Sequence, residues 1–267
     1  MSVNVHENTV HPDLLDLLRL ECIKINDYVK KRIGINQSKK YSTLWLHKDV
    51  EPETFIEYIV QQISYQDFPD GFPEGYMGME LWSQVKETRE GITFHYDKDE
   101  CLASTSNIMK YPLKSTVTYL TDTGGPTAIF KDELYNKGYL SFPKVNKHIR
   151  FDGNLFHGVI GPLGKEVPSN DNQRVTLLIN YWTYKPDEPN CIVLPKNEVL
   201  LPLEKEHKTL QESMQKEKSK IIKMNYGKGS QELIIFRNNK RIPIKFSKSL
   251  KKGYTYSFQF VKDCVIF

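Results

Sequence analysis

The feature that most constrains the fold is a succession of short segments rich in β-branched and aromatic residues between residues 79 and 182. Val, Ile, Thr and Tyr favour strands, whereas the Gly and Pro residues between the segments mark turns. Such a succession is typical of an antiparallel sandwich or barrel. The expected strands are residues 79–85, 91–97, 115–121, 127–130, 138–142, 148–152, 155–159 and 174–182.

Two helices are expected before this β-rich region. In residues 12–32, leucines and other apolar residues recur at steps of three and four. In residues 52–65, Phe55, Ile59 and Ile63 share one stripe, and Pro52 is expected in the first turn. A helix that is apolar along one stripe must bury it against another layer. We therefore expect both helices to pack on the outside of the sheet.

The remainder of the chain predicts an extension rather than a second core. Residues 186–202 contain four prolines and are expected to be extended, and residues 203–224 form a charged helix. Alternating runs in residues 232–267 predict strands, expected as a hairpin added to the main sheet. The fold class is mainly β with flanking helices (α+β). We expect a single domain over residues 1–267, with helical support in 1–66, the core in 79–182 and the extension in 186–267.

Composition excludes several classes of protein. The net charge of +4 over 267 residues is modest, and no nucleic-acid motif is found. No apolar run approaches the roughly 20 residues that cross a bilayer. The four cysteines lack zinc-site spacing and suit a reducing compartment. We therefore expect a soluble intracellular protein, cytoplasmic or alternatively nuclear, with no membrane or nucleic-acid partner.

Potential metal ligands lie at the end of one expected strand. His95 and Asp97 are two residues apart, so in an extended strand they point to the same face. His157 lies 60 positions beyond Asp97, after a turn and before a glycine that permits close backbone approach. Two imidazoles and one carboxylate on one face of a metal are typical of non-haem Fe(II) oxygenases. The sequence therefore predicts a metal site formed by these three residues.

A second group of residues suits a carboxylate ligand. A 2-oxo acid can chelate iron through its keto oxygen and adjacent carboxylate, and a distal carboxylate would then need a cation. Arg174 offers a planar fork that matches a carboxylate. Thr176, two residues on, shares its face, and Tyr119 is a further hydroxyl candidate on a core strand.

Together these residues resemble the Fe(II)/2-oxoglutarate-dependent dioxygenases, most closely their prolyl-hydroxylase-type branch. The HxD…H triad of that family matches His95, Asp97 and His157, and its Arg-x-Ser/Thr matches Arg174 to Thr176. The recurring YL…GG.T hairpin is similar to Tyr119-Leu120…Gly124-Gly125-Pro126-Thr127. The resemblance covers roughly residues 79–182 and implies a double-stranded β-helix (jelly-roll) core. The interval between His157 and Arg174 is longer than in the family, which a polar loop over residues 161–172 at the site mouth would explain.

The resemblance also implies a reaction. Its cofactors are Fe(II), 2-oxoglutarate as cosubstrate and O2, with release of succinate and CO2. The implied activity is hydroxylation of an unidentified protein, peptide or small metabolite. Asp97 argues against halogenation, because halogenases of this superfamily carry a small residue there. Desaturation, cyclisation and demethylation stay open, as does the oligomeric state.

Two other functional classes compete with this interpretation. One is a non-catalytic jelly-roll binding or scaffold protein. The other is a metal-dependent hydrolase that uses the same three ligands on zinc, although no general base is evident beside them and Arg174 would have no role.

Candidate substrate-pocket residues follow from strand alternation. Trp82 and Gln84 share a face of the strand before the metal motif, and Asn180 shares the face of Arg174. An aromatic loop over residues 68–76 and the polar loop over 161–172 could fold over this pocket. The histidines outside the triad, His148 among them, lack ligand spacing and are expected at the surface or in structural roles.

Overall fold

The computed structural model describes residues 3–33, 42–131, 137–164, 172–187, 192–214, 231–237, 240–246, 255–261 and 264–266. Side chains are described as far as Met214. Among the described residues, no helix combines the length and apolar character needed to cross a bilayer.

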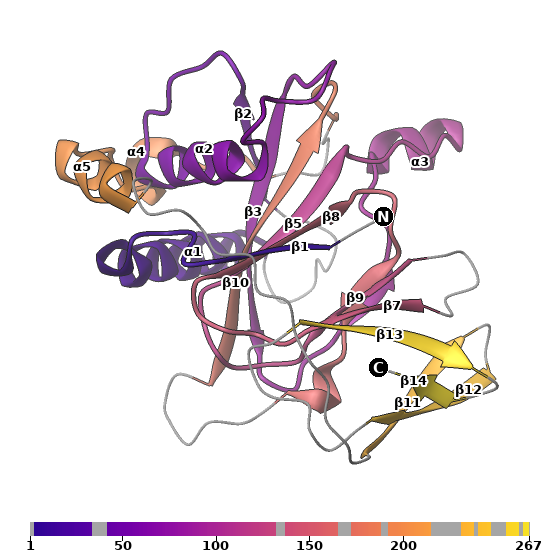
Figure 1. Ribbon diagram of the computed structural model, residues 1–267. Helices are drawn as coiled ribbons and strands as arrows, with labels where there is room; N and C mark the ends of the chain where they lie inside the picture. The colour runs from indigo at the N-terminus through magenta and orange to yellow at the C-terminus, as the bar shows by residue number, and fades with distance from the viewer. Residues whose placement is uncertain are drawn as a thin grey trace.

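Two six-stranded antiparallel sheets form the core (Figure 1). The first has the order β1-β8-β5-β10-β3-β2 and the second β14-β13-β7-β6-β9-β4. The eight central strands are β3 (Gly78–Glu87), β4 (Ile92–His95), β5 (Lys114–Tyr119), β6 (Thr127–Phe130), β7 (Lys137–Ser141), β8 (Lys147–Asp152), β9 (His157–Val159) and β10 (Gln173–Trp182). The chain passes repeatedly from one sheet to the other, and this strand order is that of a double-stranded β-helix. The expected fold class is confirmed.

Further strands lengthen both sheets. β1 (Asn4–Glu7) and β2 (Leu44–His47) form the edges of the first sheet, and β1 was not expected from the polar N-terminus. The expected C-terminal hairpin on the main sheet is wrong in detail. β13 (Thr255–Val261) pairs with β7 of the second sheet and with β14 (Cys264–Ile266), whereas β11 (Gln231–Arg237) and β12 (Lys240–Phe246) pair with each other.

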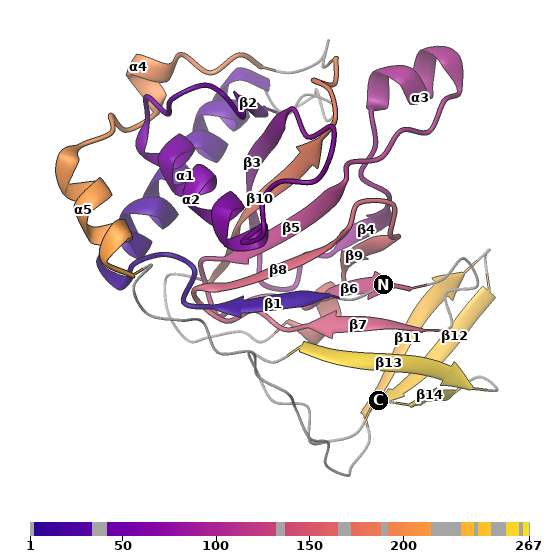
Figure 2. The ribbon, with the colours of Figure 1, turned by 45° about the horizontal axis from the view of Figure 1, so that its top comes forward.

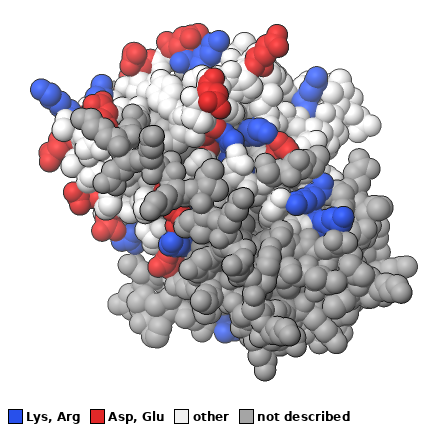
Figure 3. Space-filling view, viewed as in Figure 1, with Lys and Arg blue, Asp and Glu red and all other residues white. Residues whose placement is uncertain are grey.

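The helices α1 (Pro12–Ile33) and α2 (Phe55–Asp67) cover the outer face of the first sheet, and α5 (Lys205–Met214) packs against these two helices (Figure 2). Val175, Leu177 and Ile179 of β10 are buried in the same core cluster as Leu18 of α1 and Ile59 of α2. The expected packing of the N-terminal helices is thus confirmed. Acidic side chains gather on the solvent side of this helical layer (Figure 3), as expected for helices with one apolar stripe.

The start of α2 corrects the sequence interpretation. Its N-cap is Thr54, so Pro52 lies before the helix rather than in its first turn. The Thr54 hydroxyl accepts from the Glu57 backbone N–H at 3.4 Å, and the Glu57 carboxylate accepts from the Thr54 N–H at 3.1 Å. This capping box satisfies two otherwise unpaired donors and fixes where the helix begins.

The structure contains two short helices that the sequence did not predict. α3 (Glu100–Ser106) begins where the Asp99 carboxylate accepts from the Leu102 N–H at 2.8 Å, and it ends at Asn107 in the left-handed conformation. α4 (Lys196–Val199) lies within the segment expected to be extended. The expected helix over 203–224 is confirmed as α5 up to Met214, and its remainder lies outside the described residues.

Candidate metal centre and carboxylate clamp

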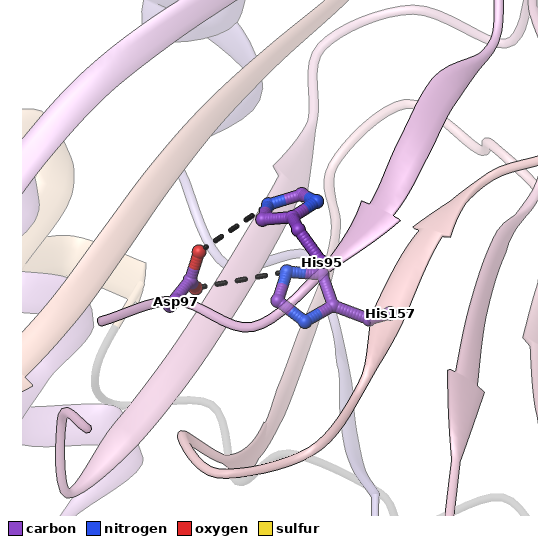
Figure 4. Close-up of side chains that lie close together, drawn as sticks. All are labelled: His95, Asp97 and His157. Atoms are coloured by element: carbon purple, nitrogen blue, oxygen red, sulfur yellow. Dashed lines mark ion pairs between the residues drawn. The ribbon is translucent and has the colours of Figure 1, made fainter. Parts of the chain in front are cut away.

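Strand pairing brings the three predicted metal ligands together (Figure 4). β4 ends at His95, β9 begins at His157, and these two residues face each other directly in the ladder. Asp97 Oδ1 lies 3.5 Å from His95 Nε2, and its Oδ2 lies 3.7 Å from His157 Nε2. One ligand atom from each residue falls within 4.8 Å of the others. Residues distant in sequence therefore present three donor atoms to one point.

Backbone carbonyls set the tautomer of both imidazoles. His95 Nδ1 lies 2.7 Å from the carbonyl oxygen of Thr93, and His157 Nδ1 lies 2.9 Å from that of Leu155. An Nδ1–H that donates to a carbonyl leaves the Nε2 lone pair free. Both Nε2 atoms are the ones turned toward Asp97. This is the outer-shell arrangement that orients histidine ligands of metals.

Burial and charge differ across the triad. Burial alone would raise the pKa of Asp97, but His157, His95 and the Ser115 hydroxyl outweigh it and hold that pKa at about 2. Burial lowers the pKa of His157, which favours its neutral, ligating form. The His95 side chain is 42% exposed, against 10% for Asp97 and 7% for His157. The centre is consequently open on the His95 side.

The donor set fits a divalent transition metal of the Fe(II) type. It offers two imidazole nitrogens and one carboxylate oxygen, and three ligands leave further coordination positions for other molecules. Zinc would accept the same donors. The triad alone therefore does not separate an oxygenase from a hydrolase, and other residues must decide.

Arg174 lies fully buried between the two sheets, with 1% exposure. Its Nη1 donates to Thr176 Oγ1 at 3.3 Å, its Nη2 to Thr127 Oγ1 at 3.1 Å, and its Nε to the carbonyl of Gly125 at 3.3 Å. All three acceptors are neutral oxygens, and no carboxylate within the described part of the chain lies within ion-pair distance of the guanidinium. A buried charge without a counter-charge is costly. The arrangement therefore fits an incoming carboxylate.

Thr127 is a clamp residue that the sequence interpretation did not single out. Its hydroxyl oxygen accepts from Arg174 Nη2 and from the Tyr119 hydroxyl at 2.8 Å. The Tyr119 hydroxyl also lies 3.1 Å from the Ser141 carbonyl. With both acceptor positions of Thr127 used, its own proton remains available to a ligand. The threonine of the GG.T hairpin was the available signal in the sequence. The contact of its hydroxyl with Arg174, however, exists only because β6 faces β10 in the folded protein.

The glycines of that hairpin make room for the guanidinium. Gly124 has a positive φ of 95°, and a Cβ there would lie 2.6 Å from the Arg174 side chain. Any larger residue at Gly124 would be strained and would displace the clamp.

The inner face of the first sheet carries polar side chains in two rows, with an apolar row between them. The register of β3, β10, β5 and β8 defines the three rows. The metal row is Glu80, Asn180, Ser115 and Phe151; the apolar row is Trp82, Leu178, Val117 and Ile149; the clamp row is Gln84, Thr176, Tyr119 and Lys147.

These rows place the other predicted site residues, those besides Arg174 and the metal triad, on the inner surface of the first sheet. Thr176 and Tyr119 lie in the clamp row, and Tyr119 stacks 5.5 Å from the Arg174 guanidinium. The three candidate pocket residues are distributed over all three rows: Gln84 in the clamp row, Trp82 in the apolar row and Asn180 in the metal row. Gln84 Oε1 and Asn180 Oδ1 are buried and have no hydrogen-bond partner among the described residues. Both atoms can therefore accept from a ligand.

The loop over residues 68–76 does not cover this site. Phe68 packs edge-on against Tyr181 with ring centroids 4.9 Å apart, and Tyr181 belongs to the helix-facing core. The expectation that this loop folds over the pocket is therefore wrong. Of the loop over 161–172, Gly161–Leu163 form a 3₁₀ turn, and residues 165–171 lie outside the described residues.

Comparison with known proteins finds similarity in structure alone. No family model matches the sequence, and no curated protein matches it. A prolyl-4-hydroxylase from Pseudomonas putida is 15% identical, with a TM-score of 0.44 over 70% of this chain and 87% of that one. A 2OG-Fe(II) oxygenase family oxidoreductase from Burkholderia pseudomallei is 12% identical, with a TM-score of 0.40 over 71% and 88%.

A third solved structure is the non-haem α-ketoglutarate-dependent epimerase SnoN of nogalamycin biosynthesis. It is 6% identical, with a TM-score of 0.35 over 76% of this chain and 94% of that one. The double-stranded β-helix follows from the strand order, and the site from its own side chains. The chain is thus similar to solved prolyl-4-hydroxylase and 2OG-Fe(II) oxygenase structures at low sequence identity.

Proposed function

We propose that the protein is an Fe(II)- and 2-oxoglutarate-dependent oxygenase that hydroxylates a protein, peptide or small-molecule substrate and releases succinate and CO2. The observation that carries the proposal is Arg174, a buried guanidinium of the first sheet with neutral partners only among the described residues, in a fold whose second sheet presents the His95–Asp97–His157 triad. A hydrolase that needs only the metal gives Arg174 no role.

The rows of the inner surface suit the chemistry of the cosubstrate. 2-Oxoglutarate is polar at both ends and has two methylene groups in the middle. The three rows are polar, apolar and polar in turn, which is the order of polarity along the ligand. Leu178 and Val117 belong to the apolar row in the middle. Successive rows are about 7 Å apart, as residues two positions apart in a strand must be. The metal row and the clamp row are therefore about 14 Å apart at the backbone, which is longer than the ligand, so side chains that reach inward must supply the matching groups.

Each residue has a distinct role in the proposed enzyme. His95, Asp97 and His157 hold Fe(II), which supplies the redox chemistry that activates O2 against a substrate C–H bond. Arg174 binds the distal carboxylate through charge and hydrogen bonds. The hydroxyls of Thr176 and Thr127 both accept from Arg174, so their protons are free to donate to that carboxylate.

The protein also controls water and orientation around this centre. His157 and Arg174 are buried, so the clamp is shielded while the His95 side stays open to a substrate. In a shielded site the attraction between guanidinium and carboxylate is stronger than in water. Asp97 supports hydroxylation over halogenation, because its carboxylate occupies the position that a halide would need.

The proposal is tested by incubating the Fe(II)-loaded protein with 2-oxoglutarate and O2 and measuring succinate. We expect succinate from the wild type and none from His157→Ala. A scaffold protein would bind neither metal nor 2-oxoglutarate, and its His157→Ala variant would behave like the wild type. A zinc hydrolase would bind metal but would gain no stability from 2-oxoglutarate.

A further inference from the structure

The metal row continues past the metal centre to two oxygen acceptors. The Ser115 hydroxyl helps to lower the pKa of Asp97, and Ser115 of β5 lies opposite Asn180 of β10, which lies opposite Glu80 of β3. These residues share the inner face, because the alternate residues Leu81 and Ile179 belong to the helix-facing core. Adjacent strands are about 4.8 Å apart, so Glu80 lies within roughly 10 Å of Ser115.

Asn180 is one of three polar residues of this surface with a buried atom that lacks a hydrogen-bond partner among the described residues, the others being Ser115 and Gln84. Asn180 is only 3% exposed, and its Oδ1 has no hydrogen-bond partner among the described residues. A buried acceptor without a donor costs about 1–3 kcal/mol, and proteins rarely retain one that nothing satisfies. Because Asn180 lies next to the candidate metal centre, a ligand is the simplest source of the missing hydrogen-bond donor.

Glu80 adds a second acceptor beside the first. It is 7% exposed, and its Oε2 accepts the indole N–H of Trp182 at 3.2 Å. A carboxylate offers about four acceptor positions, so Glu80 can accept from a ligand in addition to the donors of the fold. Facing residues of neighbouring strands have Cβ atoms about 5 Å apart. One ligand group can therefore reach both Asn180 and Glu80.

The chemistry of that group follows from the two acceptors. An alcohol or a secondary amide has a single hydrogen to donate and can satisfy one of them. An ammonium has three N–H donors and a guanidinium five, and both are attracted to a carboxylate. A cationic nitrogen group is thus the match for an amide oxygen beside a carboxylate.

We infer that Asn180 and Glu80 bind an ammonium or guanidinium group of the substrate beside the metal centre. The inference rests on the proposed function, because it identifies this group as part of an oxygenase substrate. It makes the substrate a basic compound, such as a lysine- or arginine-containing peptide or a free amine, and it makes Asn180 and Glu80 specificity residues of the site.

The test compares cationic compounds with their neutral isosteres. Lysine and norleucine, and arginine and citrulline, are offered free and within short peptides to the Fe(II)-loaded protein with 2-oxoglutarate. Succinate and a gain of one oxygen in the product are measured, and binding to metal-free protein is followed by calorimetry. We expect the cationic members to bind and react at least tenfold better, and Glu80→Gln to remove that preference while leaving 2-oxoglutarate binding intact.

Two results would overturn the inference. One is equal binding and oxidation of the cationic and neutral members. The other is a cationic preference that survives in both Glu80→Gln and Asn180→Ala. A wild-type protein that binds 2-oxoglutarate but prefers no cationic compound refutes this inference alone. A protein that neither binds nor consumes 2-oxoglutarate refutes the proposed function instead, so the two failures are distinguishable.

Discussion

The first sheet buries a polar cluster on each of its faces, and the two clusters balance their charge differently. On the outer face, Asp67 at the end of α2 lies 3.2 Å from His148 Nε2 and accepts from the Tyr181 hydroxyl at 2.7 Å. Arg150 Nη1 lies 4.0 Å from the same carboxylate. On the inner face, Arg174 meets neutral oxygens only, among the residues described.

This difference teaches how to separate structural from functional polar groups in one fold. Burial alone would raise the pKa of Asp67, but His148, Tyr181 and Arg150 lower it. Groups of the protein itself therefore stabilise the negative charge of this carboxylate. The Asp67 cluster thereby ties α2 to the sheet. Arg174 has no carboxylate partner among the described residues, and the proposed binding of 2-oxoglutarate would supply one.

The sharpest test of the comparison is to break the outer cluster. Asp67→Asn removes the carboxylate that faces His148 and Arg150, and breaking such a buried pair costs about 3–5 kcal/mol. We expect the free energy of unfolding in urea to fall by this amount. The Fe(II)-loaded variant that remains folded should bind 2-oxoglutarate like the wild type; a loss of that binding instead would mean that the two faces are not independent.

The inner clamp should respond in the opposite way. Arg174→Met removes a buried charge that has no carboxylate partner among the described residues, so the free energy of unfolding should stay within about 1 kcal/mol of wild type or rise. The stabilisation by 2-oxoglutarate, about 2.7 kcal/mol at a ligand concentration 100 times Kd, should vanish. Thermal unfolding with and without the ligand measures both effects. A strongly destabilised Arg174→Met protein would show that the residue is structural.

Two threonines, one in each sheet, provide a matched pair of smaller changes. Thr127→Val removes a hydroxyl that is proposed to donate to the ligand, and we expect up to about tenfold weaker 2-oxoglutarate binding, the loss of one hydrogen bond. Thr118→Val is the control, because the Thr118 hydroxyl lies 2.7 Å from His148 Nδ1 in the outer cluster. The control should lower stability and leave the calorimetric Kd unchanged; the reverse pattern would contradict the assignment of the two faces.

The smallest expected effect is a pH dependence of the outer cluster. Burial and the neighbouring His148 lower the pKa of His6 to about 4. A lowered histidine pKa favours the neutral form in the folded state, so stability should fall as the pH drops from about 6.5 toward 4. Asp67, whose pKa is also lowered, loses its contribution only below its ordinary value of 3.8. The free energy of unfolding in urea is measured for the wild type and for His6→Gln between pH 7 and 4.5. We expect it to depend less steeply on pH in the variant. Identical pH dependence in the two proteins would contradict the role of His6.

Much of the core could be predicted because its pattern is local. Alternation in residues 174–182 separates the helix-facing residues from the site-facing ones, and the spacing of His95 and Asp97 places both on one face. The capping of α3 by Asp99 was missed because its segment is polar and shows no helical stripe. Its helix depends on a single carboxylate rather than on a buried face.

The parts of the site that could not be predicted depend on contacts between sheets. Thr127 contacts Arg174 only because β6 of one sheet lies against β10 of the other. Within the first sheet, the place of Glu80 beside Asn180 follows from the register of β3 against β10, which is also a tertiary contact. Periodicity identifies the face on which a residue lies, whereas its partner across the core is decided by tertiary structure.

The central claim is that Arg174 exists to bind the distal carboxylate of a 2-oxo acid. The direct measurement is an anaerobic calorimetric titration of the Fe(II)-loaded protein with 2-oxoglutarate and with 2-oxobutyrate, which lacks that carboxylate. We predict binding of 2-oxoglutarate at least 100-fold tighter than that of 2-oxobutyrate in the wild type, and no difference in Arg174→Met. Equal affinities in the wild type, or a preference retained in Arg174→Met, would contradict the account.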